Sequence, residues 1–573
     1  MPDFKIQKIN DINLILEFYL CDMFIRVKTY NNNHQAVQIV ENVREHGKVN
    51  QKILRHVGRA QSDVELAKLR ELASYIITAM QVVKDPSIFP VGDLVNMVNH
   101  SRNRQDNTPI NVNLKQLREE YRIVTGIHDI YGKLFDDTGF GKLLLGCRVS
   151  KQVLRDITLA RIAKPCSKLA SGEMLTKDFG IEHALGSIYR MMDQLDEQEI
   201  TKLQTLTYEQ TKRLFGNTVS VLFYDCTTLY FESFTEDELR EFGYSKDHKF
   251  NQSQVLLALL VTTEGLPVGY EVFNGSMFEG NTLETMLDKI KLHYQLTRAI
   301  FVADSGLLSK GNIEKLEQNN IEYIVGARLK SLSRQWQERV LDSKGHIKEQ
   351  KDGDIIRHSS FKIDPNRHLI VSHSQKRAEK DKHDRDTAIE RLRSRLSKST
   401  DMKSLISNYG YQKYIKSKDK ANVEIDLDKV AQDAQWDGLH GVYTNITDFD
   451  PKQILEHYRG LWQVEESFRI SKHDLRMRPI FHWTPRRIKA HIAICFMAFS
   501  LIRTLQFKLR KSNHAISPEK VRDELYRVQS SVLYNIKNNE RYVVPSKPGQ
   551  HTTTLYKTLE MQYNSVPYRL AQK

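Results

Sequence analysis

Two aspartates each follow a run of apolar residues with the composition of a buried strand. Asp225 follows residues 219–224, and Asp304 follows residues 299–303. Neighbouring strands would bring the two carboxylates together. Their negative charges repel each other unless a proton or a hard cation such as Mg²⁺ lies between them. Alternatively, each aspartate merely opens a turn at its strand end. The presence of both favours a metal site, because open α/β sheets place their sites at the carboxyl ends of strands.

A third carboxylate lies in residues 458–472. On a continuous helix, steps of seven residues return to nearly the same face, so Tyr458, Glu465 and Lys472 would line one side. The neighbouring Glu466 would point about a third of a turn away. A carboxylate flanked by a phenol and an ammonium group could bind a metal ion while its neighbours hold phosphate.

The same segment also has a simpler interpretation, an ordinary amphipathic helix with Trp462 and Phe468 in the core. Basic residues crowd the sequence around and after Glu465, namely Arg459, Arg469, Lys472, Arg476, Arg478, Arg486, Arg487 and Lys489. Such a run is often only a solvated face, but its position beside the expected site favours binding to the phosphates of a nucleic acid.

Composition indicates a folded protein with polyanionic partners. The chain has 573 residues, enough for several domains, and is 40% hydrophobic and 27% charged. Its 85 Lys and Arg outnumber its 71 Asp and Glu, which gives a net charge of +14. Basic side chains bind phosphates and release condensed counterions, so this excess favours a nucleic acid, although it does not specify one.

Cysteine usage and the chain start favour a reducing cytoplasm. The five cysteines are scattered and form no C-x-x-C pair, so neither a disulfide framework nor a zinc cluster is indicated. The start lacks a basic segment followed by an apolar one, and the apolar stretch 492–502 is too short to span a bilayer. We therefore expect neither export nor membrane insertion.

Hydrophobic periodicity predicts an α/β protein. Apolar and polar residues alternate in residues 1–58, which predicts a β-hairpin that turns at residues 46–48. Residues 62–84 have helical spacing, and residues 110–215 are expected to be mostly helical. The expected strands after that are 219–224, 229–231, 255–262, 268–273, 299–303, 321–327 and 441–444. The expected helices are one from Asn281, then 309–319, 451–477, 484–510 and one from Ser517. Residues 331–440 form a charged region in which residues 376–385 read as a solvated helix.

Together these motifs resemble a DDE transposase of the insertion sequence 4 superfamily, in its long-insertion branch. The third block of that family reads Tyr-x2-Arg-x3-Glu-x6-Lys, and Tyr458, Glu465 and Lys472 match it. The family arginine is replaced by Leu461, with Arg459 two residues earlier. The two aspartates match the first and second acidic positions, and the charged region lies where the family carries a largely β insertion. The similarity extends from about residue 35 to residue 510, and residues 458–491 are its most specific part.

The resemblance implies a ribonuclease-H-like core, a mixed sheet flanked by helices that an insertion interrupts. It implies two Mg²⁺ or Mn²⁺ ions, bridged by Asp225 and completed by Asp304 and Glu465, for in-line displacement at phosphorus. Water first frees a 3′-hydroxyl at the transposon end, and this hydroxyl then attacks target DNA. The implied partners are double-stranded terminal inverted repeats, target DNA and a second copy of the chain, on the nucleoid of a bacterial cytoplasm.

The resemblance also implies a division of labour along the chain. The expected regions are a DNA-binding hairpin and helix (1–100), a DNA-binding helical module (101–215), the core in two parts (216–330 and 441–512), the charged insertion (331–440) and a tail for dimerisation or DNA contact (513–573). In relatives an aromatic residue of the insertion stacks on a flipped base, a role that Trp436 could take, although a packed core tryptophan is the simpler interpretation. Residues 1–215 show no zinc-finger spacing.

Two alternatives remain open. One is a nuclease of similar core that cuts DNA without strand transfer. The other is a DNA-binding protein derived from a transposase, in which Leu461 marks decay. The intact acidic positions favour an active enzyme, and no P-loop, H-E-x-x-H or dinucleotide fingerprint supports an ATPase, a zinc protease or a dehydrogenase.

Overall fold

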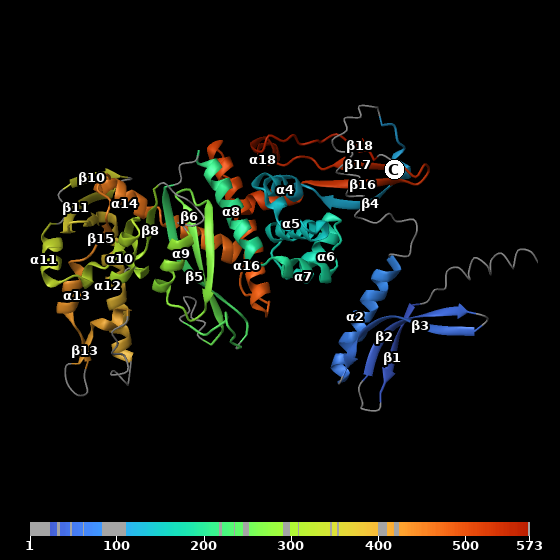
Figure 1. The fold of residues 1–573 in the computed structure, drawn as a ribbon, viewed down its shortest axis with the longest axis horizontal. Helices are drawn as coiled ribbons and strands as arrows, with labels where there is room; N and C mark the ends of the chain where they lie inside the picture. Colours follow the sequence, from blue (N-terminus) through green and yellow to red (C-terminus); the bar gives the residue numbers. More distant parts are fainter. Residues whose placement is uncertain are drawn as a thin grey trace, which may run out of the picture. The chain divides into compact units, whose positions relative to one another are not determined.

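The fold comes from a computed structural model (Figure 1). Internal contacts divide the chain into two units, Met1–Leu94 and Val95–Lys573. The structure describes residues 23–30, 35–45, 48–60, 62–82, 110–216, 220–233, 235–243, 251–289, 298–307, 309–343, 347–351, 354–398, 410–417 and 423–570.

The first unit is a three-stranded antiparallel sheet covered by a helix. Its strands are β1 (Met23–Thr29), β2 (Gln35–Glu45) and β3 (Lys48–Ala60), and its helix is α2 (Asp63–Val82). Val37 and Ile39, two residues apart on β2, point to one face and are buried with Ala73 of α2. The predicted hairpin and helix are confirmed, β1 is added to them, and the turn residues 46–47 lie outside the described residues.

The second unit contains a mixed nine-stranded sheet in the order β10-β11-β12-β15-β9-β8-β5-β6-β7. Its central strands β5, β8 and β9 are parallel, and all other neighbours are antiparallel. The bounds of six of these strands are β5 (Val221–Tyr230), β6 (Gln254–Thr262), β7 (Pro267–Asn274), β8 (Ile300–Ala303), β9 (Glu322–Ala327) and β15 (Leu439–Thr444). The predicted α/β class, with a mixed sheet and flanking helices, is confirmed.

Strand β5 corrects one prediction. The sequence indicated two short strands with Asp225 after the first, but the structure has one strand of ten residues in which Asp225 is the fifth. Thr227 and Thr228, which lie between the two apolar runs, are buried within the strand and pair with β6. A β-branched threonine fits a pleated strand whichever face it occupies, so its polarity was no signal of a strand end.

Helices cover both faces of this sheet. Leu222 and Tyr224 of β5 pack with α9 (Leu283–Lys289) and α10 (Lys310–Gln318). Phe223 and Leu229 point to the opposite face and pack with the segment from α14 (Pro451–Arg459) to α16 (Pro485–Lys511). Because side chains alternate along a strand, Asp225 shares the face of Phe223.

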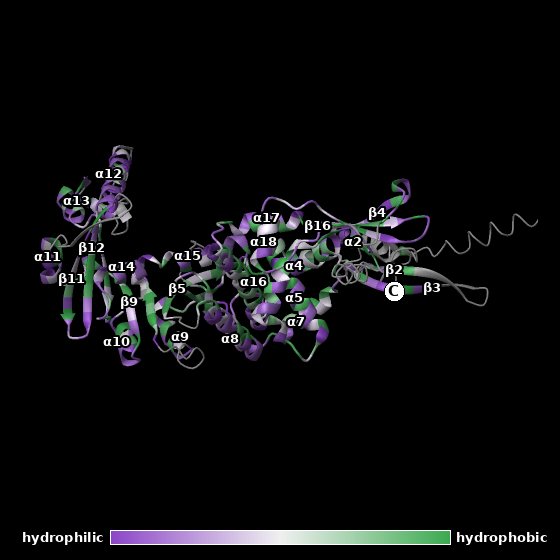
Figure 2. Ribbon diagram, turned by 90° about the horizontal axis from the view of Figure 1, so that it is seen from above, coloured by the Kyte–Doolittle hydropathy of each residue, from purple (hydrophilic) through white to green (hydrophobic). Residues whose placement is uncertain are grey.

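Residues 331–440 continue the sheet. Strands β10 (Ile347–Lys351), β11 (Asp354–Asp364) and β12 (Arg367–Ser374) join it where β12 pairs with β15. The segment also contains α11 (Arg334–Ser343), α12 (Gln375–Lys398), α13 (Leu427–Ala434) and the short hairpin β13 (Ile415–Ser417) and β14 (Val423–Ile425). The charged run is indeed helical, and α12 is hydrophilic along most of its length (Figure 2).

The predicted helical module also contains a strand, and this strand pairs with the C-terminal residues. Its helices are α4 (Gly126–Thr138), α5 (Arg148–Ala163), α6 (Lys168–Phe179), α7 (Leu185–Gln194) and α8 (Glu197–Leu214). Strand β4 (Leu117–Val124) forms a four-stranded sheet with β16 (Gln529–Asn535), β17 (Arg541–Pro545) and β18 (Tyr568–Arg569). Helices α17 (Pro518–Arg527) and α18 (Thr552–Thr558) complete this region, so residues 518–569 are folded onto the module.

Helix α16 is the central packing element of the second unit. It contacts the sheet through β7 and the helical module through α4, α5, α7 and α8. The sequence suggested that its apolar stretch is too short for a bilayer, but by length and composition the whole helix is long and apolar enough to cross one. Its apolar window is 94% buried in the protein, which accounts for that composition by packing.

Candidate active site

Asp225 and Asp304 lie side by side at the centre of the sheet. Strands β5 and β8 are parallel neighbours in which Tyr224 is level with Ala303, so the aspartates that follow these two residues are also level. Both aspartates are partly exposed. Asp304 Oδ1 accepts a hydrogen bond from the Gly306 N–H at 2.7 Å, and the described residues offer no partner to its Oδ2. The pair therefore has the position and the oxygen donors that a hard cation requires.

The helix that carries Glu465 is not the continuous helix that the sequence predicted. Helix α14 ends at Arg459, α15 runs over Trp462–Arg469, and a π-helical turn, η9, follows over Ile470–Asp474. A change from α to π geometry shifts the residues beyond it around the axis. The seven-residue steps that were to align Tyr458, Glu465 and Lys472 are therefore interrupted twice.

The break between the two helices lets α15 pack closely on β5. A Cβ atom added at Gly460 would lie 2.5 Å from Cζ of Phe223, which only a glycine avoids. Phe223 shares its face of β5 with Asp225 and is two residues from it. The α14–α15 connection is thereby held over the strand that carries the first aspartate.

Tyr458 joins this site through its hydroxyl. Gly326 on β9 leaves room for the phenol, because a Cβ atom at that position would overlap the Tyr458 Oη. Burial, together with the charges of Asp304 and Glu465, raises the pKa of Tyr458 to about 12, although Arg377 acts in the opposite sense. The phenol therefore keeps its proton at neutral pH and remains a hydrogen-bond donor.

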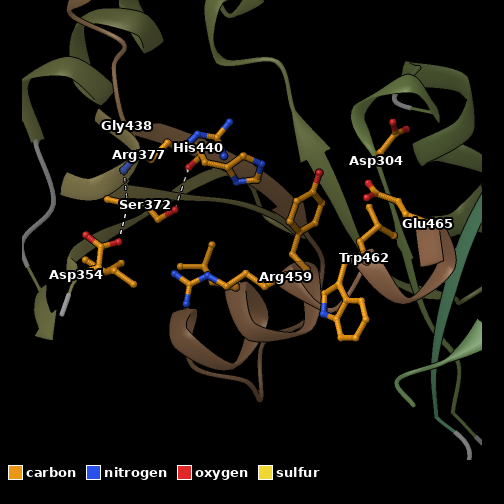
Figure 3. A pocket seen from close by; sticks show the side chains of 14 residues that line it. Asp304, Asp354, Ser372, Arg377, Gly438, His440, Arg459, Trp462 and Glu465 are labelled. Atoms are coloured by element: carbon orange, nitrogen blue, oxygen red, sulfur yellow. Dashed lines mark hydrogen bonds between the residues drawn. The ribbon is translucent and has the colours of Figure 1, made fainter. Parts of the chain in front are cut away.

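Asp304, Tyr458 and Glu465 line one cleft of about 450 Å³, and the two carboxylates occupy the same end of it (Figure 3). Glu465 is exposed. Among the residues that the structure describes, no three His, Cys, Asp or Glu side chains come close enough together to hold a metal ion. Asp304 and Glu465 thus share one cleft, and Asp225 lies on the strand next to Asp304, but the three carboxylates form no coordination set.

Glu466, the neighbour of Glu465, has a different environment. It accepts a charge-assisted hydrogen bond from Arg503 at 3.2 Å, and Arg469 lies 3.6 Å away. The Arg503 side chain is only 1% exposed and also donates to Gly265 O and to Gln463 Oε1, each at 2.7 Å. Glu466 therefore compensates a buried guanidinium and is turned away from the cleft.

The basic residues of this segment divide into two groups. Arg487 forms two 2.7 Å hydrogen bonds with Asp193 of α7, and Arg469 lies 3.6 Å from both Glu466 and Asp474, so these two are engaged in ion pairs. The guanidinium of Arg478 lies over the Tyr230 ring at the end of β5. Lys489 donates to the carboxylate of Glu197 in α8 at 2.8 Å. The remaining members are Arg459, Arg476 and Arg486, which are exposed, and Lys472, which is half-buried.

Of the two tryptophans that the sequence singled out, one lies in its expected environment and the other does not. Trp436 is partly buried and packs against the apolar cluster of Leu329 and Leu369, as the simpler interpretation of its sequence position had it. The interpretation of residues 458–472 as an ordinary amphipathic helix placed Trp462 in the core, but its side chain is 52% exposed and lines the cleft. The position of Trp462 beside the site could have been predicted from the sequence, because Trp462 and Glu465 are three residues apart and therefore share a helix face.

The other end of the cleft contains residues that the sequence did not single out. Arg377 of α12 and His440 of β15 line it together with Arg459 (Figure 3). Burial, aided by the charges of Arg377 and Arg459, lowers the pKa of His440 to about 4, so the ring is neutral at physiological pH. Arg377 belongs to the charged run that was interpreted as a solvated face, and only the folding of α12 against the sheet reveals its position.

Comparison with known families agrees with this geometry. Residues 217–501 match the family described as "Transposase DDE domain", and residues 25–81 match the "IS1634 family transposase, N-terminal domain". The chain belongs to the DDE transposases of insertion sequences. The first match covers the strands that carry Asp225 and Asp304 and the helix that carries Glu465, and the second covers the β1–β3 sheet with most of α2. A search of the curated proteins finds no match.

Membership of this family establishes the broad function. The chain is a DNA transposase, and its mixed α/β sheet is consistent with the ribonuclease-H-like fold of DDE enzymes. Enzymes of this class bind DNA and depend on divalent metal ions.

Proposed function

We propose that this transposase cleaves DNA at the ends of its insertion sequence and joins them to target DNA, with Asp225, Asp304 and Glu465 as its metal-binding carboxylates. One observation carries the proposal. Asp225 and Asp304 are level on adjacent parallel strands, and the face of Asp225 is the face against which the α14–α15 connection packs next to Glu465.

The donor set fits two Mg²⁺ or Mn²⁺ ions, since all three residues offer hard carboxylate oxygens. When bound, a pair of such ions activates the attacking oxygen and stabilises the leaving one in an in-line displacement at phosphorus. By the family resemblance, Asp225, Asp304 and Glu465 would together hold the two ions. The adjacent aspartates supply the fixed part of this set, because both are held by a parallel strand pair.

Glu465 supplies the adjustable part. Its side chain is exposed, has no hydrogen bond or ion pair with the described residues, and has three rotatable bonds. A change of rotamer, with a small shift of α15 about Gly460, would move its carboxylate toward the aspartates. Tyr458, protonated and placed beside Asp304, is suited to donate a hydrogen bond to a phosphate oxygen held between the carboxylates.

Other contacts with DNA extend the site. Arg459, Arg476 and Arg486, which are exposed and form no ion pair with the described residues, are suited to phosphate binding, whereas the ion pairs of Arg469 and Arg487 favour a structural role for those two. We assign recognition of the terminal inverted repeats to residues 1–215, which contain the matched N-terminal domain. We further propose a homodimer on paired ends, acting in a bacterial cytoplasm.

Trp462 is better placed than Trp436 to stack on a base beside the cut. It offers an exposed face in the cleft, whereas Trp436 packs on an apolar cluster. Base stacking on an aromatic side chain contributes about 1–3 kcal/mol, so Trp462→Ala should weaken binding to a terminal-repeat duplex by about 5- to 150-fold, and Trp462→Phe by much less. Fluorescence anisotropy measures both. If Trp436→Phe weakens binding in a folded protein and Trp462→Ala does not, the stacking residue is Trp436.

The test of the proposed function is a reaction on DNA. The purified chain with Mg²⁺ or Mn²⁺ should cut a duplex that carries its terminal repeat and join the end to a plasmid, and EDTA should remove both products. Cutting without joining would indicate a nuclease of the same core. Binding without any cutting would indicate a DNA-binding protein derived from a transposase.

A further inference from the structure

The end of the cleft opposite the carboxylates contains two arginines that approach from different parts of the chain. Arg377 lies in the first turn of α12, within residues 331–440, and Arg459 is the last residue of α14. Both side chains line the cleft that also contains Asp304 and Glu465 (Figure 3). One cleft thus has an acidic end and a basic end.

The position of Arg377 is fixed by the start of α12. Ser374 Oγ accepts a hydrogen bond from the Arg377 N–H at 3.1 Å and donates one to Asp354 Oδ2 at 2.5 Å. Asp354 Oδ1 accepts from the Lys376 N–H at 3.0 Å. The carboxylate of Asp354, which also lines this end of the cleft, is therefore engaged in capping the helix.

Two further contacts hold α12 against the loop before β15. Arg385 donates to both oxygens of Asp437, at 2.5 and 2.7 Å, and its side chain is 9% exposed. Asp381 Oδ2 accepts from the Gly438 N–H at 3.0 Å. Because that loop leads directly into His440, these contacts fix α12 beside the strand that lines the basic end of the cleft.

At this end the two guanidinium groups outnumber the one carboxylate that lines it, that of Asp354, whose oxygens are already engaged at the start of α12. His440 is neutral at physiological pH, since burial and the two arginines lower its pKa to about 4. The nearest described carboxylate to Arg377 is Asp381, at 3.9 Å, and Arg459 forms no ion pair with the described residues. A strand of DNA places one negative charge about every 3.4 Å, so a strand held at the carboxylates presents further phosphates to these cations.

We propose that Arg377 and Arg459 together bind the phosphodiester backbone of the DNA strand next to the phosphate that is cut. Leu461 cannot donate to phosphate, and Arg377 supplies a guanidinium to the same cleft from the inserted segment. The inference rests on the proposed function, since it takes the DNA strand to enter the cleft at Asp304 and Glu465. Planar guanidinium groups suit this contact because each can donate two parallel hydrogen bonds to a phosphate.

The experiment is a salt titration of DNA binding. A fluorescein-labelled duplex with one end of the insertion sequence is bound by the full chain in Ca²⁺ buffer, and affinity is measured by anisotropy at several KCl concentrations. Each phosphate contact contributes about 0.9 to the slope of log affinity against log salt. Arg377→Ala and Arg459→Ala should each lower the magnitude of that slope by about 0.9, and Arg377→Lys should retain it.

The matched control is Arg391→Ala, an exposed arginine 14 residues further along α12, which should leave the slope unchanged. Methylphosphonate substitutions then locate the contact. Neutralising one phosphate near the cut should weaken the wild-type chain but add no further loss to Arg377→Ala. Unchanged slopes for both cleft variants would overturn the inference. If the same wild-type preparation still cuts DNA with Mg²⁺, the proposed function stands and only the role of the two arginines is wrong.

Discussion

Replacing Asp304 by asparagine should reduce DNA cleavage by at least about 10³-fold and leave binding to a terminal-repeat duplex intact. The amide keeps the size of the side chain but removes the charge that would hold a cation beside Asp225 in the proposed site. Metal ions supply several kcal/mol of charge stabilisation to a phosphoryl transition state, and each 1.4 kcal/mol corresponds to a tenfold change in rate. Gel assays of cleavage and anisotropy of binding, both with Mg²⁺ at neutral pH, measure the two effects. Asp225→Asn should behave in the same way.

The matched control is Asp342→Asn on α11, an exposed carboxylate remote from the parallel strand pair. Its cleavage rate should equal that of the wild type. An Asp304→Asn variant that still cuts within tenfold of the wild-type rate would remove Asp304 from the metal-binding set.

The adjacent glutamates should give opposite results. Glu465→Ala should abolish cleavage with a change of less than about 0.5 kcal/mol in the free energy of unfolding, because its side chain is exposed and has no partner among the described residues. Glu466→Ala should retain cleavage below its melting transition but lose about 2 kcal/mol of stability. The substitution leaves the positive charge of the buried Arg503 without its carboxylate partner. The expected loss is smaller than for a fully buried ion pair because the Glu466 side chain is 25% exposed.

Urea denaturation and a cleavage assay on the same preparations separate these two roles. Glu466→Gln is the useful companion, since its amide oxygen can still accept a hydrogen bond from Arg503 and should recover part of the stability. If Glu466→Ala abolishes cleavage while Glu465→Ala does not, the third carboxylate of the site is Glu466.

Local patterns in the sequence predicted most of the elements correctly. Alternating apolar and polar residues on either side of residues 46–48 gave the β2–β3 hairpin, and Ser309, Asp450 with Pro451, and Ser517 with Pro518 lie where helices α10, α14 and α17 begin. These features depend on the backbone conformation of a few neighbouring residues. Errors arose where a local signal was ambiguous, as in the threonines of β5 and the uninterrupted helical spacing across Gly460.

What the sequence by itself could predict is which acidic residues are candidates for the site and which elements they lie in or beside, because strand and helix periodicity and carboxylate chemistry are local properties. The tertiary structure decided which side chains share a cleft. It placed Asp225 level with Asp304, turned Glu466 to Arg503, exposed Trp462, and brought Arg377 of a charged helix to face Arg459. Such contacts join residues far apart in the chain, and they depend on strand order and helix packing, which no window of sequence contains.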